Sequence, residues 1–66
     1  MTTPLEYGAV LATGTVADDT ITIEVGALGP VELDTLIGVG APRRFARITG
    51  HTADDSTETL TVAWED

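Results

Sequence analysis

Apolar residues recur at every second position in two segments of the chain. Isoleucine and valine alternate with threonine and glutamate in residues 20–25 (TITIEV), and leucine, valine and tryptophan alternate with threonine and alanine in residues 58–64 (ETLTVAW). A period of two puts alternate side chains on opposite faces of an extended strand, whereas an amphipathic helix needs a period of about 3.6. Both segments are therefore predicted to be half-buried strands. Trp64 is predicted to pack in the core beside Leu60 and Val62, with an interface anchor as the alternative.

Three further segments have the composition of strands, at residues 7–16, 30–37 and 43–49. Glycine and proline at residues 26–30 and 38–42 mark turns between them, and no segment supports a helix longer than a turn. We therefore expect one all-β domain over residues 1–66, folded as an antiparallel barrel or sandwich of about five strands and of SH3-like or OB-like size.

An internal repeat refines this expectation. The sequence TGTVADDT at residues 13–20 recurs as TGHTADDS at residues 49–56, and five of the eight positions are identical. Ala-Asp-Asp is typical of a turn, because aspartate side chains bond backbone amides nearby. The repeat predicts two related hairpins. Gly14 and Gly50 are expected at bulges or bends that curl the sheet toward closure, which favours a barrel.

The same hairpins contain the residues that could suggest chemistry. Carboxylates are typical calcium ligands, but the side chains of neighbouring residues in an extended segment point to opposite sides and cannot hold one ion together. We therefore interpret the paired aspartates as turn residues. His51 is the only histidine and is predicted to be a solvated turn residue. Ser56, His51 and Asp54 lie within one turn that is too short to hold a catalytic triad. We expect no enzyme, and no catalytic, cofactor or metal site.

Charge restricts the partners. The formal net charge is −8 at pH 7, so the chain repels nucleic acid and anionic lipid, and we expect protein partners, with neither nucleic acid nor membrane among them. The sequence shows no leader pattern and no apolar run near the roughly 18 residues of a membrane span. A small core without cysteine favours stabilisation by oligomerisation or docking.

The three basic side chains, Arg43, Arg44 and Arg47, fall within five residues. In a strand, one face would carry Arg43, Phe45 and Arg47, and the opposite face Arg44, Ala46 and Ile48. Two interpretations remain open for the first face. It either pairs with carboxylates of neighbouring strands, or forms a docking stripe, since arginine and aromatic residues are enriched in protein interfaces. The candidate carboxylates are Glu32, Asp34 and Glu58.

The N-terminal segment has no clear period. Pro4, Leu5 and Tyr7 are its notable side chains, and residues 1–6 are predicted to form an extended docking arm on a neighbouring molecule, and not a strand in their own sheet. The candidate interface therefore comprises Pro4, Leu5, Tyr7, Arg43, Phe45 and Arg47.

With its small size, acidity, all-β pattern and lack of cysteine, and with the segments TGTVADDT, TGHTADDS and APRRFARITG, the chain resembles the small capsid decoration and minor virion proteins of tailed bacterial viruses. The resemblance implies a non-enzymatic protein that docks in many copies on a larger assembly, at the virion surface; otherwise we expect a cytoplasmic protein. Two alternatives remain: a free-standing β-barrel binding module, and an acidic regulator that mimics nucleic acid.

Overall fold

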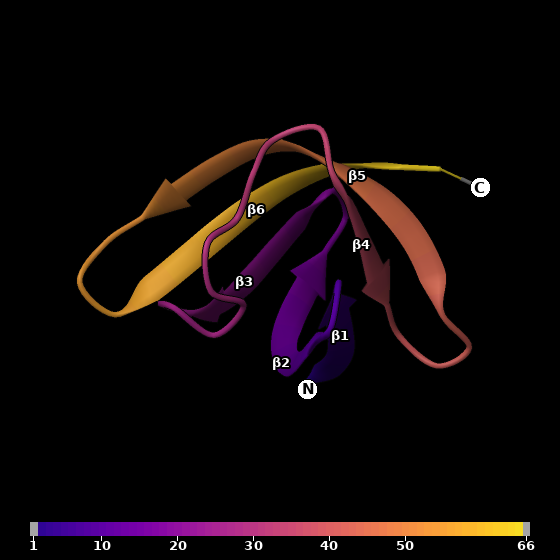
Figure 1. Ribbon diagram of the computed structural model, residues 1–66, viewed down its shortest axis with the longest axis horizontal. Helices are drawn as coiled ribbons and strands as arrows, with labels where there is room; N and C mark the ends of the chain where they lie inside the picture. Colours follow the sequence, from indigo (N-terminus) through magenta and orange to yellow (C-terminus); the bar gives the residue numbers. More distant parts are fainter. Residues whose placement is uncertain (1, 66) are drawn as a thin grey trace.

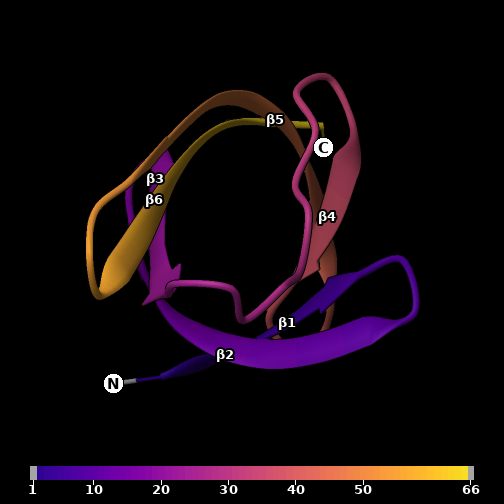
Figure 2. The same cartoon turned by 60° about the vertical axis from the view of Figure 1, so that its left-hand side comes forward.

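The computed structural model describes residues 2–65, which form a closed barrel of six antiparallel strands (Figure 1). The strands are β1 (Thr3–Tyr7), β2 (Val10–Ala17), β3 (Thr20–Glu24), β4 (Leu36–Val39), β5 (Arg44–Ala53) and β6 (Thr57–Trp64). Their order around the barrel is β1-β2-β3-β6-β5-β4, and Figure 2 shows them following one another around a ring. The prediction of an all-β antiparallel fold is confirmed, with six strands in place of about five.

The additional strand is β1, and it corrects the prediction of an N-terminal arm. Residues 3–6 pair with β2 along their length, and Leu5 opposite Val39 and Glu6 opposite Gly38 join β1 to β4. Leu5 is only 2% exposed and lies in the core. Met1, the first residue of the predicted arm, lies outside the described residues. The alternation in this segment is weak because, of its inward positions Thr3, Leu5 and Tyr7, the first is polar and only Leu5 is fully buried.

Three predicted strands also had wrong boundaries. The strand predicted at residues 43–49 is β5, which begins at Arg44 and continues to Ala53. The segment 7–16 is interrupted by a turn at Gly8, which has a φ of +60° that disfavours other residues, so β1 ends at Tyr7 and β2 begins at Val10. The predicted strand at residues 30–37 is mostly the irregular end of the β3–β4 connection. Only Leu36 and Ile37 belong to β4, which continues through Val39 into the predicted turn.

The core fills the barrel with ten buried apolar residues: Leu5, Ile21, Ile23, Leu28, Ile37, Val39, Ala46, Ile48, Leu60 and Val62. Nine come from strand positions that face inward. The tenth, Leu28, belongs to the β3–β4 connection, where it is 1% exposed. Burial of such a side chain contributes about 1.5–3 kcal/mol, so this connection is packed into the fold and does not merely link two strands.

Both copies of the repeat form hairpin turns, as predicted. Ala17 pairs with Thr20 across the two residues Asp18 and Asp19, whereas Ala53 pairs with Glu58 across a longer turn. The two glycines differ in role. Gly14 is buried where β2 passes from its pairing with β1 to its pairing with β3, and Gly50 lies at a β-bulge, where the register with β6 shifts between Ile48 and Gly50.

Trp64 lies at one end of the barrel and is only partly buried against the core, whereas Leu60 and Val62 are fully inside. Its indole N–H donates a hydrogen bond of 3.0 Å to the carbonyl of Asp18, and the guanidinium of Arg44 lies 4.4 Å from the ring centroid. The predicted packing beside Leu60 and Val62 is therefore confirmed in part, since the ring also joins the β2–β3 turn to β5.

Candidate functional site

The outer face of β4 and β5 carries the predicted arginine stripe. Ala46 and Ile48 point into the core with no exposed area, so Phe45 and Arg47 point outward. Arg43 precedes β5, in the turn after β4, and its side chain lies across Gly38 of β4. The predicted sharing of one face by Arg43, Phe45 and Arg47 is therefore confirmed, although Arg43 is not in the strand.

Gly38 is required for the position of Arg43. A Cβ at residue 38 would lie 2.5 Å from Cδ of Arg43, so any side chain there would displace the arginine. In this position Nη1 of Arg43 lies 2.6 Å from Oε1 of Glu6, on the neighbouring strand β1. Because both side chains are partly exposed, water screens this ion pair and it contributes at most about 1 kcal/mol.

Exposed apolar side chains surround this ion pair. The register places Leu11, Glu6, Gly38 and Phe45 in one row across β2, β1, β4 and β5, and Leu36 opposite Arg47 in the next row. Leu11 is 74% exposed, Phe45 49% and Leu36 46%. We name the surface formed by Glu6, Leu11, Leu36, Arg43 and Phe45 the Arg43 face.

A shallow pocket of about 260 Å³ adjoins the Arg43 face. Small-molecule sites usually enclose about 300–1,000 Å³, so this pocket is better matched to a single side chain than to a cofactor. It is lined by residues of β1, β2 and the β4–β5 turn: Pro4, Leu5, Glu6, Leu11, Ala12, Gly40 and Arg43.

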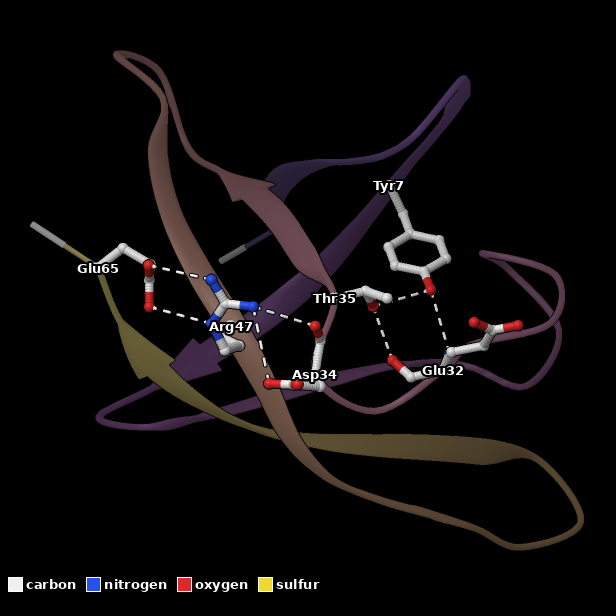
Figure 3. A network of polar contacts seen from close by, with 6 residues as sticks. All are labelled: Tyr7, Glu32, Asp34, Thr35, Arg47 and Glu65. Atoms are coloured by element: carbon white, nitrogen blue, oxygen red, sulfur yellow. Dashed lines mark hydrogen bonds and ion pairs between the residues drawn. The ribbon is translucent and has the colours of Figure 1, made fainter.

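Arg47 makes contacts within its own chain. Nη1 donates a hydrogen bond of 3.1 Å to the carbonyl of Asp34, and Nε lies 3.5 Å from Oε2 of Glu65 (Figure 3). The Asp34 carboxylate lies 3.6 Å from Nη1. Of the carboxylates predicted to pair with arginine, Asp34 does so, Glu58 instead contacts His51, and Glu6 and Glu65 were not predicted. Arg47 therefore ties the end of the β3–β4 connection to the end of β6.

Tyr7 fixes the same connection from the opposite side. Its hydroxyl accepts a hydrogen bond of 3.1 Å from the Glu32 amide and lies 3.0 Å from the Thr35 hydroxyl, which itself donates to the Glu32 carbonyl (Figure 3). Tyr7 is partly buried against the core, and its hydroxyl holds the β3–β4 connection in place.

The prediction that His51 is a solvated turn residue is confirmed in part, because the residue is exposed but belongs to β5 and not to the turn. His51 lies in β5 opposite the buried Leu60, and its Nε2 lies 2.5 Å from Oε2 of Glu58. The bulge explains the contact with Glu58. Two residues, Thr49 and Gly50, stand between Ile48 and the next position on the inner side of the sheet, so the alternation shifts by one. His51 therefore lies on the same side of the sheet as Leu60 while remaining exposed.

Glu58 is a buried carboxylate, with 4% of its surface exposed. Its Oε1 accepts a hydrogen bond of 2.6 Å from the Gly26 amide. That bond, together with the bond to His51, lowers the pKa of Glu58 below its ordinary value, although burial acts in the opposite direction. Glu58 therefore joins the start of the β3–β4 connection to the β5–β6 hairpin as a carboxylate.

The second aspartate turn has the predicted turn chemistry. Oδ1 of Asp54 accepts hydrogen bonds from the amides of Ser56 and Thr57 and from the Thr57 hydroxyl, and the Thr57 and Ser56 amides lower the pKa of Asp54. His51 is bonded to Glu58, so Ser56, His51 and Asp54 do not form a triad. Within residues 2–65, no three His, Cys, Asp or Glu side chains gather as metal ligands.

The Arg43 face includes three residues that the sequence analysis did not select, namely Glu6, Leu11 and Leu36. A signal for the two leucines was present, because Val10-Leu11-Ala12 and Leu36-Ile37 are runs of consecutive apolar residues. In a strand with one buried face, one member of each such run must face the solvent.

No known protein family matches the chain, and no curated protein sequence or solved structure matches it. In the described part of the chain, no helix is both long enough and apolar enough to cross a bilayer.

Proposed function

We propose that the chain is a non-enzymatic structural protein of SH3-like or OB-like size that docks in many copies on a larger protein assembly, most concretely as a decoration or minor protein of a virion capsid. One observation carries this proposal: Leu11 and Phe45 lie on either side of the Arg43–Glu6 ion pair, and Leu36 lies in the next row, with all three apolar side chains exposed. Several large apolar side chains exposed on one face of a small domain suit a binding site for another protein.

The contacts of the arginines refine the docking stripe. Arg47 is engaged by Asp34 and Glu65, and Arg43 by Glu6, so most of the positive charge is compensated inside the chain. Recognition is therefore assigned mainly to Phe45, Leu36 and Leu11, with Arg43 positioned to exchange Glu6 for a carboxylate of the partner. Pro4 contributes through the rim of the pocket. Leu5 and Tyr7 support the face from within.

A second candidate function is a free-standing binding module, and the pocket beside the Arg43 face favours it. Its volume of about 260 Å³ suits one apolar side chain of a peptide.

The other alternative, an acidic regulator that mimics nucleic acid, requires closely spaced negative charges on one face. The exposed Asp18-Asp19 and Asp54-Asp55 pairs instead lie at opposite ends of the β3–β6 pair, which does not favour it.

Site-specific photo-cross-linking in the native source tests the docking proposal. A photoreactive phenylalanine analogue replaces Phe45, and the matched control places the same analogue at Val25, which is 42% exposed and outside the Arg43 face. We expect residue 45 to cross-link to one assembly protein, and Arg43→Glu to abolish the product. Equal labelling of diverse proteins from positions 45 and 25 would contradict the proposal.

A further inference from the structure

The β5–β6 hairpin has an open edge. β4 pairs with β5 only through residues 44–47, and Ile48 then bonds Asp34 and Thr35 at the end of the β3–β4 connection. Beyond Ile48, no other segment within residues 2–65 pairs with β5 on the side away from β6. Figure 1 shows this hairpin reaching past the end of β3.

The register identifies which backbone groups face the open edge. Asp54 N–H donates to the Thr57 carbonyl, and opposite residues in an antiparallel pair alternate between bonded and non-bonded. Counting back from that bond, Thr52 and Gly50 are bonded to β6, whereas the amides and carbonyls of His51 and Ala53 point outward. Among the described residues, neither His51 nor Ala53 has a backbone hydrogen bond to a segment other than β6.

We propose that this edge pairs with the same edge of a second copy, antiparallel and around a two-fold axis at Thr52. In that register His51 lies opposite Ala53 of the second copy, and each pair exchanges two backbone hydrogen bonds. On the axis, Thr52 lies opposite Thr52 of the second copy, and the two residues form a pair without backbone hydrogen bonds. Two threonines facing each other in such a pair stabilise a sheet. The two hairpins then form one continuous sheet.

The chemistry of the edge favours a second copy as its occupant. Two chains that each carry a formal charge of −8 repel one another, so they can pair only where carboxylates do not face each other. The residues on the outer face of this edge, Thr49, Gly50 and Thr52, are uncharged. In the proposed register the exposed Asp54 lies opposite Gly50 of the second copy, so no two carboxylates meet within the paired residues. Lysine and proline, which protect many sheet edges, are absent from residues 49–53, and the bulge at Gly50 limits the pairing to the residues that follow it. The contact is short, so the dimer is weak unless an assembly concentrates it.

This inference does not rest on the docking proposal, because residues 49–53 share no member with the Arg43 face. Salt separates the two contacts. Screening weakens repulsion between the acidic chains, so added salt strengthens the edge pairing, whereas it weakens any bond between Arg43 and a carboxylate of the partner. Phe45→Ser leaves the edge pairing unchanged.

Disulfide trapping tests the register. The chain has no cysteine, so Thr52→Cys introduces a single thiol, and non-bonded pairs in an antiparallel sheet have a Cα separation of about 4.5 Å, which a disulfide spans. The matched control is Thr22→Cys, an exposed position on β3 between β2 and β6. Under mild oxidation Thr52→Cys is expected to form dimers at least about tenfold faster than Thr22→Cys, because pairing raises the effective thiol concentration.

Amide hydrogen exchange tests the pairing in the unmodified chain. Exchange at His51 and Ala53 is expected to slow as protein concentration rises toward about 1 mM, a range suited to a weak dimer. Thr52, whose amide is bonded to β6, serves as the internal control and is expected to be protected at all concentrations. Equal cross-linking of the two cysteine variants, with concentration-independent exchange at His51 and Ala53, would overturn self-pairing and leave the edge to a strand of a different protein.

Discussion

Gly14→Ala and Gly50→Ala change the same position in the two copies of the repeat, and the structure predicts very different costs. A Cβ at residue 14 would lie 2.7 Å from the Thr22 carbonyl oxygen, 2.8 Å from Cγ2 of Ile23 and 2.9 Å from Cδ1 of Leu5. At residue 50 the nearest atom would be Cβ of Thr61, at 3.3 Å. Only the first glycine therefore excludes a methyl group by contact with backbone and core.

The magnitude follows from overpacking. An extra methyl group in a packed core costs about 1–3 kcal/mol, and the upper part of that range applies to Gly14 because one neighbour is a backbone carbonyl that cannot rotate away. At either site, alanine also lowers the conformational entropy of the unfolded chain, which stabilises the folded state by about 0.4–1 kcal/mol. We therefore expect Gly14→Ala to lower the free energy of unfolding by about 2 kcal/mol, and Gly50→Ala to change it by less than about 1 kcal/mol.

Urea titration with fluorescence from Trp64, the only tryptophan, measures both values. The corresponding loss in Tm for Gly14→Ala is roughly 8–16 °C, since each kcal/mol shifts a domain of this size by about 4–8 °C. Equal midpoints for the two variants would refute the tight packing inferred around Gly14. Greater damage from Gly50→Ala would refute the assignment of the two glycines to different roles.

Two further predictions concern the ties on the β3–β4 connection. Glu58→Gln removes a carboxylate whose pKa is lowered by its hydrogen bonds with Gly26 and His51. The carboxylate stabilises the fold at a pH above its unfolded pKa of about 4.3, and this contribution is lost as the pH falls through the lower pKa of the folded state. The gap in unfolding free energy between wild type and Glu58→Gln should therefore be full above about pH 5 and narrow on acidification, and a gap that widens in acid would contradict this role. Tyr7→Phe removes the hydroxyl that bonds Glu32 and Thr35 and should cost about 0.5–1.5 kcal/mol, with faster amide exchange at Glu32; unchanged exchange there would contradict the network.

Much of the barrel was predictable because its strands obey a simple alternation. β3 and β6 follow from period two, and the repeat located both aspartate hairpins. The same pattern contained an unused signal, since Glu58 is in phase with Leu60 and Val62 and so had to face inward. A carboxylate at an inward position calls for hydrogen-bond partners, and these proved to be Gly26 and His51.

Other features depend on contacts between distant segments. Leu28 is a core residue only because the β3–β4 connection folds back on the barrel, and no local pattern distinguishes it from the exposed Leu33. The position of Arg43 depends on Gly38 and Glu6 from two other strands. The bulge beside Gly50 was expected as a bend, but its effect on the facing of His51 depends on the register with β6.

The number of copies of the chain on particles from its native source tests the docking proposal most directly. The account predicts that the chain, 6.9 kDa alone, is present on a much larger particle in many copies and at a fixed ratio to one shell protein. It also predicts that Phe45→Ser lowers that ratio while Val25→Ser does not, with both variants retaining the urea midpoint of the wild type. Recovery of the chain only at its free mass, or equal occupancy by Phe45→Ser and wild type, would contradict it.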